Sequence, residues 1–149
     1  MSNILGNDMV AQIGIVVDNI EEAGKKWAEF FQVDVPPIIG SGPDEIVKAE
    51  VNGERSDASC KMMFFAAQNI QIELIEPDEK PSTWRDDLNK NGEGVHHLAF
   101  NIKGMKETIA RLEANGIPLL QKGEYTGGRY AYMDSSKTFK TLIELLEND

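Results

Sequence analysis

Four polar side chains interrupt apolar runs of the chain, and their types are those that bind metal ions. They are Gln12, Glu73, His97 and Glu144. One imidazole, two carboxylates and one amide oxygen form a mostly hard donor set. With two waters it suits an octahedral Ni, Co, Mn or Mg ion, with Zn as a further option. The set holds no thiolate, which argues against a structural zinc site.

The four residues occupy matching places in what reads as a duplicated unit. Each copy begins with a short apolar strand that carries one donor, Gln12 in the first copy and His97 in the second. Each copy ends with an apolar strand that carries a carboxylate, Glu73 and then Glu144. A single glutamate on a strand usually marks a solvated face. The coincidence of four donors at matching positions is what favours a shared site on a pseudo-twofold axis.

Each copy is predicted to contain a strand, a helix and three further strands, so the fold class is α+β with two tandem βαβββ modules. In the first copy, Asn19 followed by Glu22 is a typical start of a helix, and Asn52-Gly53 is a typical hairpin turn. The first copy's elements are predicted at residues 10–17, 20–31, 45–51, 60–66 and 70–75. Those of the second copy are predicted at residues 95–102, from Met105 to a cap at Gly116, near Leu119, at 129–133 and at 141–147.

The whole chain, residues 1–149, is interpreted as a single domain. The first module spans residues 9–76, a linker spans 77–93 and the second module spans 94–148. The linker is polar, and we expect a short helix from Ser82 within it.

The alternation of strand residues predicts which face each side chain occupies. Ile13, Ile15 and Val17 form a bulky set that can pack beneath a helix, and Gln12 lies on the opposite face. Glu73 and Glu144 likewise alternate with large aliphatic residues and should point away from the helices. His96 is expected on the face opposite to His97.

Composition excludes several classes of partner. The chain has 149 residues, 41% of them apolar, and a formal charge of −10, so nucleic acids and anionic membranes are repelled at long range. No apolar stretch reaches the roughly 20 residues of a membrane span, and the N-terminus does not resemble a secretory signal. The single cysteine, Cys60, fits a small buried residue and a reducing cytoplasm. The acidity does not exclude a small-molecule ligand, even an anionic one, because local lysines and a metal ion can override the overall field over a few ångströms.

The order of these motifs resembles the vicinal oxygen chelate superfamily over nearly the whole chain, from about Ala11 to Glu147. The resemblance rests on three blocks: Asn-Gly-Glu-Gly-Val-His-His-Leu-Ala-Phe at residues 91–100, Ile-Glu-Leu-Ile-Glu-Pro at 72–77, and Leu-Ile-Glu-Leu at 142–145. The local match is strongest to methylmalonyl-CoA epimerase. The resemblance implies that the modules form an open, barrel-like mixed sheet around a metal cleft. The metal ligands would then be Gln12, Glu73, His97 and Glu144.

Some positions depart from the epimerase pattern. Those epimerases have histidine at the position of Gln12, whereas eukaryotic glyoxalase I has glutamine there. A second catalytic glutamate of the epimerases corresponds to a position close to Lys61, and this departure argues against two-base epimerase chemistry. The loop at residues 134–140 lacks the glycine that often precedes the last strand.

The resemblance implies a metal-dependent isomerase or lyase of the glyoxalase I or methylmalonyl-CoA epimerase type. Such an enzyme abstracts a proton α to a carbonyl of a thiol-linked substrate, through a metal-stabilised enediolate or enolate. Glu144 is the expected base.

The residues do not identify the thiol carrier, which could be glutathione or CoA. Basic side chains at the cleft mouth would suit CoA, and the candidates by position are Lys122, Arg129, Lys137 and Lys140.

The alternative function is non-catalytic ligand binding, as in bleomycin-resistance proteins. Extradiol oxygen chemistry is disfavoured because its iron site uses two histidines. Relatives often dimerise, so a homodimer is compatible with the resemblance, although no residue fixes its arrangement.

Overall fold

The first strands of the two modules pair with each other at the centre of one sheet. In the computed structural model, which describes residues 3–149, β1 (Gln12–Val16) runs antiparallel to β7 (Gly94–Asn101). The last strand of each module flanks this pair in parallel, β6 (Gln71–Pro77) beside β1 and β10 (Leu142–Asn148) beside β7. The strands that carry the four polar residues are therefore direct neighbours.

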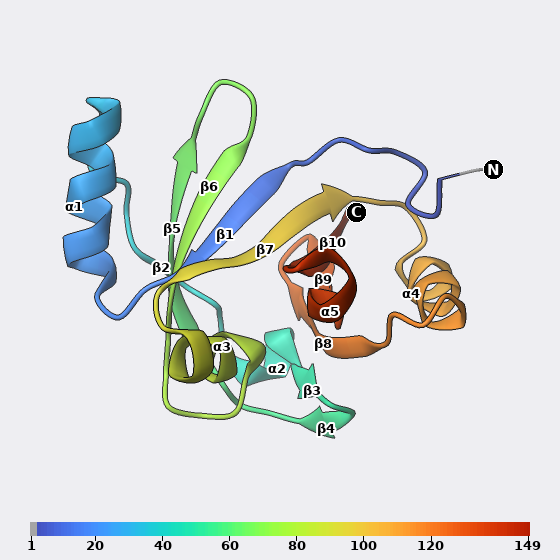
Figure 1. Cartoon of the computed structure of the whole chain (residues 1–149). Helices are drawn as coiled ribbons and strands as arrows, with labels where there is room; N and C mark the ends of the chain where they lie inside the picture. Colours follow the sequence, from blue (N-terminus) through green and yellow to red (C-terminus); the bar gives the residue numbers. More distant parts are fainter. Residues whose placement is uncertain (1–2) are drawn as a thin grey trace.

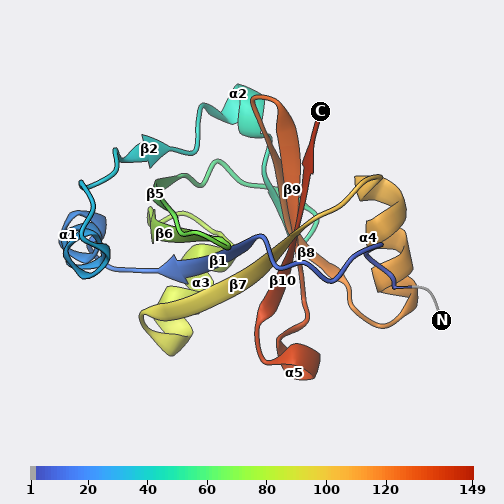
Figure 2. The same ribbon diagram turned by 90° about the horizontal axis from the view of Figure 1, so that it is seen from above.

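The remaining strands extend the sheet on both sides until it curls. The full order is β2-β5-β6-β1-β7-β10-β9-β8-β3-β4. The outer strands are β2 (Ile39–Gly40), β5 (Cys60–Ala66), β9 (Gly128–Met133), β8 (Leu119–Tyr125), β3 (Glu50–Val51) and β4 (Glu54–Arg55). Figures 1 and 2 show the two halves of the curled sheet facing each other. The predicted fold, two modules in one open, mixed α+β sheet, is confirmed.

One long helix covers the outer face of each module. The helix α1 (Ile20–Phe31) packs against β5 and β6, and α4 (Met105–Ala114) packs against β9 and β10. The two helices lie on opposite sides of the molecule (Figures 1 and 2). The side chain of Asn19 accepts a hydrogen bond from the Glu22 amide at 3.1 Å, so the predicted start of α1 is confirmed.

The strand predicted at residues 45–51 is wrong over its first half. Asp44–Val47 is the short helix α2, and only β3 (Glu50–Val51) is extended. Pro43 supplies a backbone angle suited to a helix start, and Asp44 and Glu45 favour the positive end of the helix dipole.

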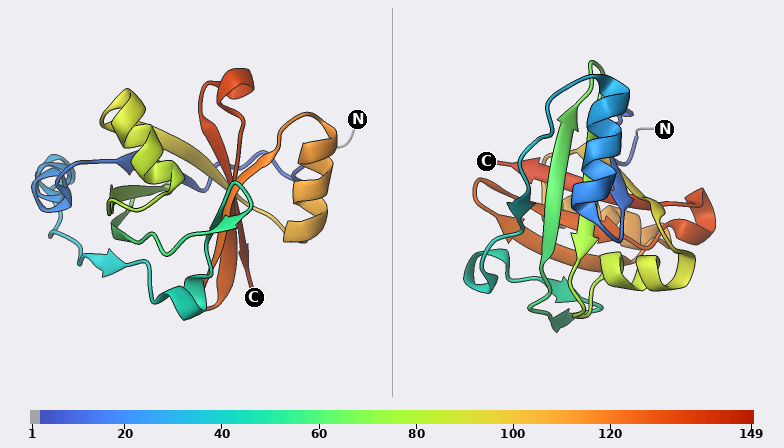
Figure 3. Two further views of the ribbon diagram at one scale, coloured as in Figure 1. Left: turned by 90° about the horizontal axis from the view of Figure 1, so that it is seen from below. Right: turned by 90° about the vertical axis from the view of Figure 1, so that its left-hand side faces the viewer.

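The hairpin that follows α2 leaves its own module. The strand β3 pairs with β4 (Glu54–Arg55) around the predicted Asn52-Gly53 turn, and its other edge pairs with β8 of the second module. The first module keeps only the two-residue β2 beside β5. A segment of the first module therefore completes the outer edge of the second (Figure 3, left).

The linker contains the predicted short helix, α3 (Thr83–Asn91). The Ser82 hydroxyl caps it by accepting a hydrogen bond from the Arg85 amide, and Trp84 and Leu88 are buried in the interior of the sheet. A further short helix, α5 (Ser136–Phe139), precedes β10. Among the helices of residues 3–149, none is both long enough and apolar enough for a membrane span.

The predicted alternation holds in β1 and fails at one point in β7. Ile13 and Ile15 pack against the cluster that includes α1, whereas Gln12 lines the interior. In β7, however, Gly14 pairs with His97 and Ile15 pairs with Val95, which leaves His96 as the extra residue of a β-bulge. The bulge breaks the alternation, so the placement of His96 on the opposite face is wrong. Its ring contacts that of His97 edge-on.

Gly14 makes room for the His97 ring where β1 and β7 cross. A Cβ atom on Gly14 would overlap the imidazole of His97, so no other residue fits without moving that ring. The absence of a side chain on one strand thus sets the position of a side chain on the other.

We predict that Gly14→Ala destabilises the protein by about 1–3 kcal/mol, because overpacking forces the His97 ring from its position. Urea denaturation should show the loss, and NMR signals of the imidazole protons should shift. Gly40→Ala is the matched control, since a Cβ there meets nothing within 4 Å. Equal stability of the two variants, with unshifted imidazole signals in Gly14→Ala, would contradict the prediction.

Candidate functional site

The four predicted site residues meet around one ring nitrogen. The His97 Nε2 atom lies 2.8 Å from Gln12 Oε1, 2.9 Å from Glu144 Oε2 and 3.4 Å from Glu73 Oε1. All four residues are buried. The duplicated strands therefore bring both donors of each module to one point.

The imidazole cannot satisfy all three oxygens. A ring nitrogen carries at most one proton, and only the contact to Gln12 Oε1 has the geometry of a hydrogen bond. The buried Glu73 Oε1 and Glu144 Oε2 accept no hydrogen bond from the described residues. Buried carboxylate oxygens are costly unless a cation or a donor compensates them. The group of Glu73, His97 and Glu144 could accordingly hold a metal ion.

The neighbouring charges change the protonation of the site. Burial by itself lowers the pKa of the His97 imidazole, but the attraction of Glu144 and Glu73 outweighs burial and raises that pKa to about 10. Burial raises the pKa of Glu73, the proximity of Glu144 raises it further, and His97 partly offsets the rise. In the absence of a metal, a protonated His97 thus provides the counter-charge for the carboxylates near neutral pH.

A second layer of hydrogen bonds orients the donors. The Gln12 amide donates through Nε2 to Gln71 Oε1 at 2.6 Å, which turns its Oε1 oxygen toward His97. On the far side of the ring, His97 Nδ1 lies 2.8 Å from His96 Nδ1, and His96 Nε2 lies 3.2 Å from Thr83 Oγ1. Burial holds the pKa of His96 well below its usual value, so His96 is neutral and its Nδ1 can accept the proton on His97 Nδ1. This leaves His97 Nε2 as the ligand atom.

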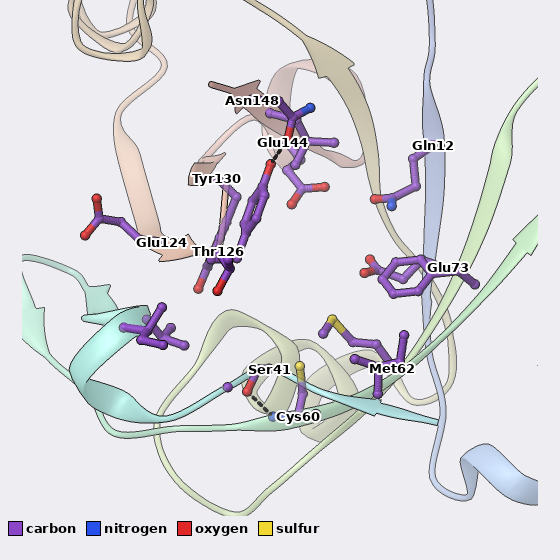
Figure 4. A pocket seen from close by; sticks show the side chains of 18 of the residues that line it. Gln12, Ser41, Cys60, Met62, Glu73, Glu124, Thr126, Tyr130, Glu144 and Asn148 are labelled. Atoms are coloured by element: carbon purple, nitrogen blue, oxygen red, sulfur yellow. Dashed lines mark hydrogen bonds between the residues drawn. The ribbon is translucent and has the colours of Figure 1, made fainter. Parts of the chain in front are cut away.

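Three of the four site residues, Gln12, Glu73 and Glu144, line a cavity of about 700 Å³, and His97 lies behind them in contact with all three. Figure 4 shows Gln12 and Glu73 on one wall and Glu144 with Tyr130 on the facing wall. Aromatic rings make much of the lining: Phe64, Trp84, Tyr125, Tyr130 and Tyr132. The cavity is concave and largely apolar with a few convergent polar groups, as small-molecule sites usually are.

The two tyrosines of β9 that line the cavity, Tyr130 and Tyr132, were not predicted from the sequence. Tyr132 pairs in register with Glu144, and its ring packs at 5.1 Å from the ring of His97. Trp84 Nε1 donates to the Tyr132 hydroxyl, and Gln121 Nε2 donates to the Tyr130 hydroxyl, each at 3.0 Å. The signal was the alternation in Tyr130-Ala131-Tyr132, which puts both tyrosines on the face of Glu144 once β9 is paired with β10.

The position near Lys61 supplies no base to the cavity. Cys60, Met62 and Phe64 line the cavity, whereas Lys61 lies between them on the other face of β5. There its amine pairs with Glu76 at 3.2 Å.

The basic residues that are candidates for the cleft mouth lie outside the lining of the cavity, and their place at its mouth stays a prediction. None of the four candidates lines the cavity: Lys122, Arg129, Lys137 and Lys140. The first two form ion pairs instead, Lys122 with Glu50 at 3.3 Å and Arg129 with Glu147 at 2.9 Å.

Solved structures with a similar fold include methylmalonyl-CoA epimerases. The epimerase from Mycobacterium tuberculosis is 21% identical, with a TM-score of 0.61 over 100% of this chain and 92% of that one. A methylmalonyl-CoA epimerase solved in complex with methylmalonyl-CoA and NH4+ is 20% identical, with a TM-score of 0.63 over 94% of each chain. A hypothetical protein from Bacillus halodurans C-125 is 20% identical, with a TM-score of 0.64 over 94% of each chain. At these identities the likeness shows the fold.

The sequence comparisons reach further than the fold. The uncharacterized protein YqjC of Bacillus subtilis (strain 168) is 31% identical over 94 residues, which are 61% of this chain and 67% of that protein. The family model described as glyoxalase/bleomycin resistance protein/dioxygenase superfamily matches residues 11–132, which include β1, β6 and β7 with three of the four site residues. The chain therefore belongs to the glyoxalase/bleomycin resistance protein/dioxygenase superfamily.

Proposed function

We propose that this protein is a metal-dependent enzyme that moves a proton next to a carbonyl group, with Gln12, Glu73, His97 and Glu144 as its metal ligands. The observation that carries the proposal is the convergence of three acceptor oxygens on one imidazole nitrogen, with two of those oxygens buried and without a donor. A divalent cation is the simplest group that would satisfy all of them. The glyoxalase I and methylmalonyl-CoA epimerase reactions are its two models.

The groups that line the cavity limit which residue can act as the base in the proposed proton transfer. A divalent ion held here would polarise the substrate carbonyl and offset the negative charge that develops as the proton leaves. Among the described lining residues the carboxylates are Glu73, Glu144 and Glu124, and Glu124 pairs with Lys48 at 3.9 Å. The base must then come from the two buried glutamates. We assign it to Glu144, following the family resemblance, and assign Glu73 to holding the metal.

The proposed substrate is an α-carbonyl thioester or hemithioacetal. Support for a thioester comes from the similarity to epimerases, one of which was solved with methylmalonyl-CoA. Support for a hemithioacetal comes from Gln12, where eukaryotic glyoxalase I has glutamine.

We expect the purified protein to bind about one divalent ion per chain, and His97→Ala to lose most of it, since the ring nitrogen lies at the centre of the donor set. Elemental analysis after dialysis against a weak chelator would measure both. Lys61→Ala is the matched control, because Lys61 faces away from the cavity and should leave the metal content unchanged. Equal metal in wild type and His97→Ala would reject the ligand assignment.

Metal binding should release about one proton near pH 7. The pKa of His97 is about 10 without metal, so the ion must displace the proton on Nε2 before it can bind there. The apparent metal affinity should therefore rise about tenfold per pH unit between pH 7 and pH 9. Calorimetric titrations in buffers of different ionisation enthalpy measure the released proton, and a pH-independent affinity would argue against a protonated His97.

Glu144→Gln should reduce turnover by at least about a hundredfold while leaving substrate binding within a few-fold, because an amide cannot take the proton. Deuterium exchange from solvent into a panel of α-carbonyl thioesters and hemithioacetals, followed by NMR, measures the proton transfer. Glu73→Gln is the paired variant, and its main defect should be metal loss. Exchange without net product indicates an epimerase, and conversion of the methylglyoxal hemithioacetal indicates a glyoxalase. Binding without exchange would instead favour the non-catalytic alternative.

A further inference from the structure

We infer that the part of the substrate that enters the cavity is uncharged and carries no anionic group besides the oxygen that forms during the reaction. This inference rests on the proposed function, because it takes the buried donor set as a metal site. It names a substrate class, a neutral acyl or α-hydroxycarbonyl group, and it excludes acyl groups with a free carboxylate of the malonyl type.

The charges of the cavity lining carry the inference. Among the described lining residues the charged ones are Glu73, Glu124 and Glu144, all acidic, and neither lysine nor arginine is present. Two of these carboxylates belong to the proposed metal site. Together they neutralise a divalent ion, so the loaded site has no excess positive charge to offer a second anion.

Two cations next to lining residues, Lys48 and Lys61, already have carboxylate partners. Lys48 pairs with Glu124 at 3.9 Å, which makes the carboxylate at the edge of the cavity part of a neutral pair. Lys61 lies on the opposite face of β5 and pairs with Glu76 at 3.2 Å. A substrate carboxylate inside the cavity would lose its hydration without gaining a cationic partner, which disfavours its binding.

The polar groups that remain suit a neutral acceptor. The hydroxyls of Tyr130 and Tyr132 each accept one hydrogen bond, from Gln121 and Trp84, and within residues 3–149 neither donates one. A tyrosine phenol is uncharged near neutral pH, so each hydroxyl keeps a proton that it can donate. Two uncharged O–H donors beside aromatic rings match a carbonyl or hydroxyl oxygen on an apolar body.

The test compares two thioesters that differ by one carboxylate, S-propionyl-N-acetylcysteamine and S-methylmalonyl-N-acetylcysteamine. Both carry an α-proton and the same short thiol, and neither carries a phosphate. Binding to the wild-type protein reconstituted with Ni²⁺ is measured by calorimetry, and α-proton exchange in D2O is measured by NMR. We expect the propionyl thioester to bind at least about tenfold more tightly. Equal or tighter binding of the methylmalonyl thioester, or binding of neither, would overturn the inference.

A pair of variants at Met62 separates charge from shape. Met62 lines the cavity and is half-buried, so a side chain of similar length can replace it. Met62→Lys should shift the binding ratio toward the methylmalonyl thioester by about tenfold or more, whereas the neutral Met62→Gln should leave the ratio near that of wild type. An unchanged ratio in Met62→Lys would show that charge does not control selection.

The two proposals fail in different ways. If the propionyl thioester binds selectively but its α-proton does not exchange, the charge selectivity stands and the proton-transfer function fails. If the methylmalonyl thioester binds more tightly and its α-proton exchanges, the function stands and the inference of an uncharged substrate fails.

Discussion

The burial of two carboxylates beside one imidazole is the constraint on which the rest of this structure depends. Side chains such as Glu73 and Glu144 are seldom buried together, because each loses hydration and each repels the other. The protonated His97 ring lies beside both carboxylates, and its positive charge reduces that cost. Gln12 contributes a neutral oxygen at the same point. The bulge at His96, the missing side chain at Gly14 and the Gln12–Gln71 hydrogen bond all serve to hold this arrangement. Interactions that fix the ring of His97 are therefore as important as the charged groups themselves.

The symmetric and asymmetric parts of the fold have different roles. The four central strands are related by a pseudo-twofold, and each module supplies two of the site residues. The cavity walls do not follow this symmetry, because the tyrosines of β9 line one side and Cys60, Met62 and the end of α2 line the other. The central strands thus define what chemistry is feasible, and the walls define which molecules can reach it.

Much of the site could be predicted because strand alternation and duplication are visible in the residues. Glu73 and Glu144 recur at the same place in two similar strands, and alternation turns both to one face. His96 could not be placed, since a bulge is a two-strand property that depends on the pairing of β7 with β1. The interpretation of residues 45–47 as a strand failed for a local reason, as the turn chemistry at Pro43 outweighed the apolar pattern. Alternation indicates that Tyr130 and Tyr132 share a face, but which face lines the cavity depends on the register between β9 and β10, which the residues alone do not give.

The hairpin β3–β4 has a consequence for how the two modules can be assembled. It belongs to the first module by sequence and to the second by pairing, since β3 borders β8. An exchange of modules between two chains would have to carry this hairpin across or break its pairing with β8. The hairpin therefore adds a contact between the modules, in addition to the central pairing of β1 with β7, that any exchange between chains would have to preserve or break.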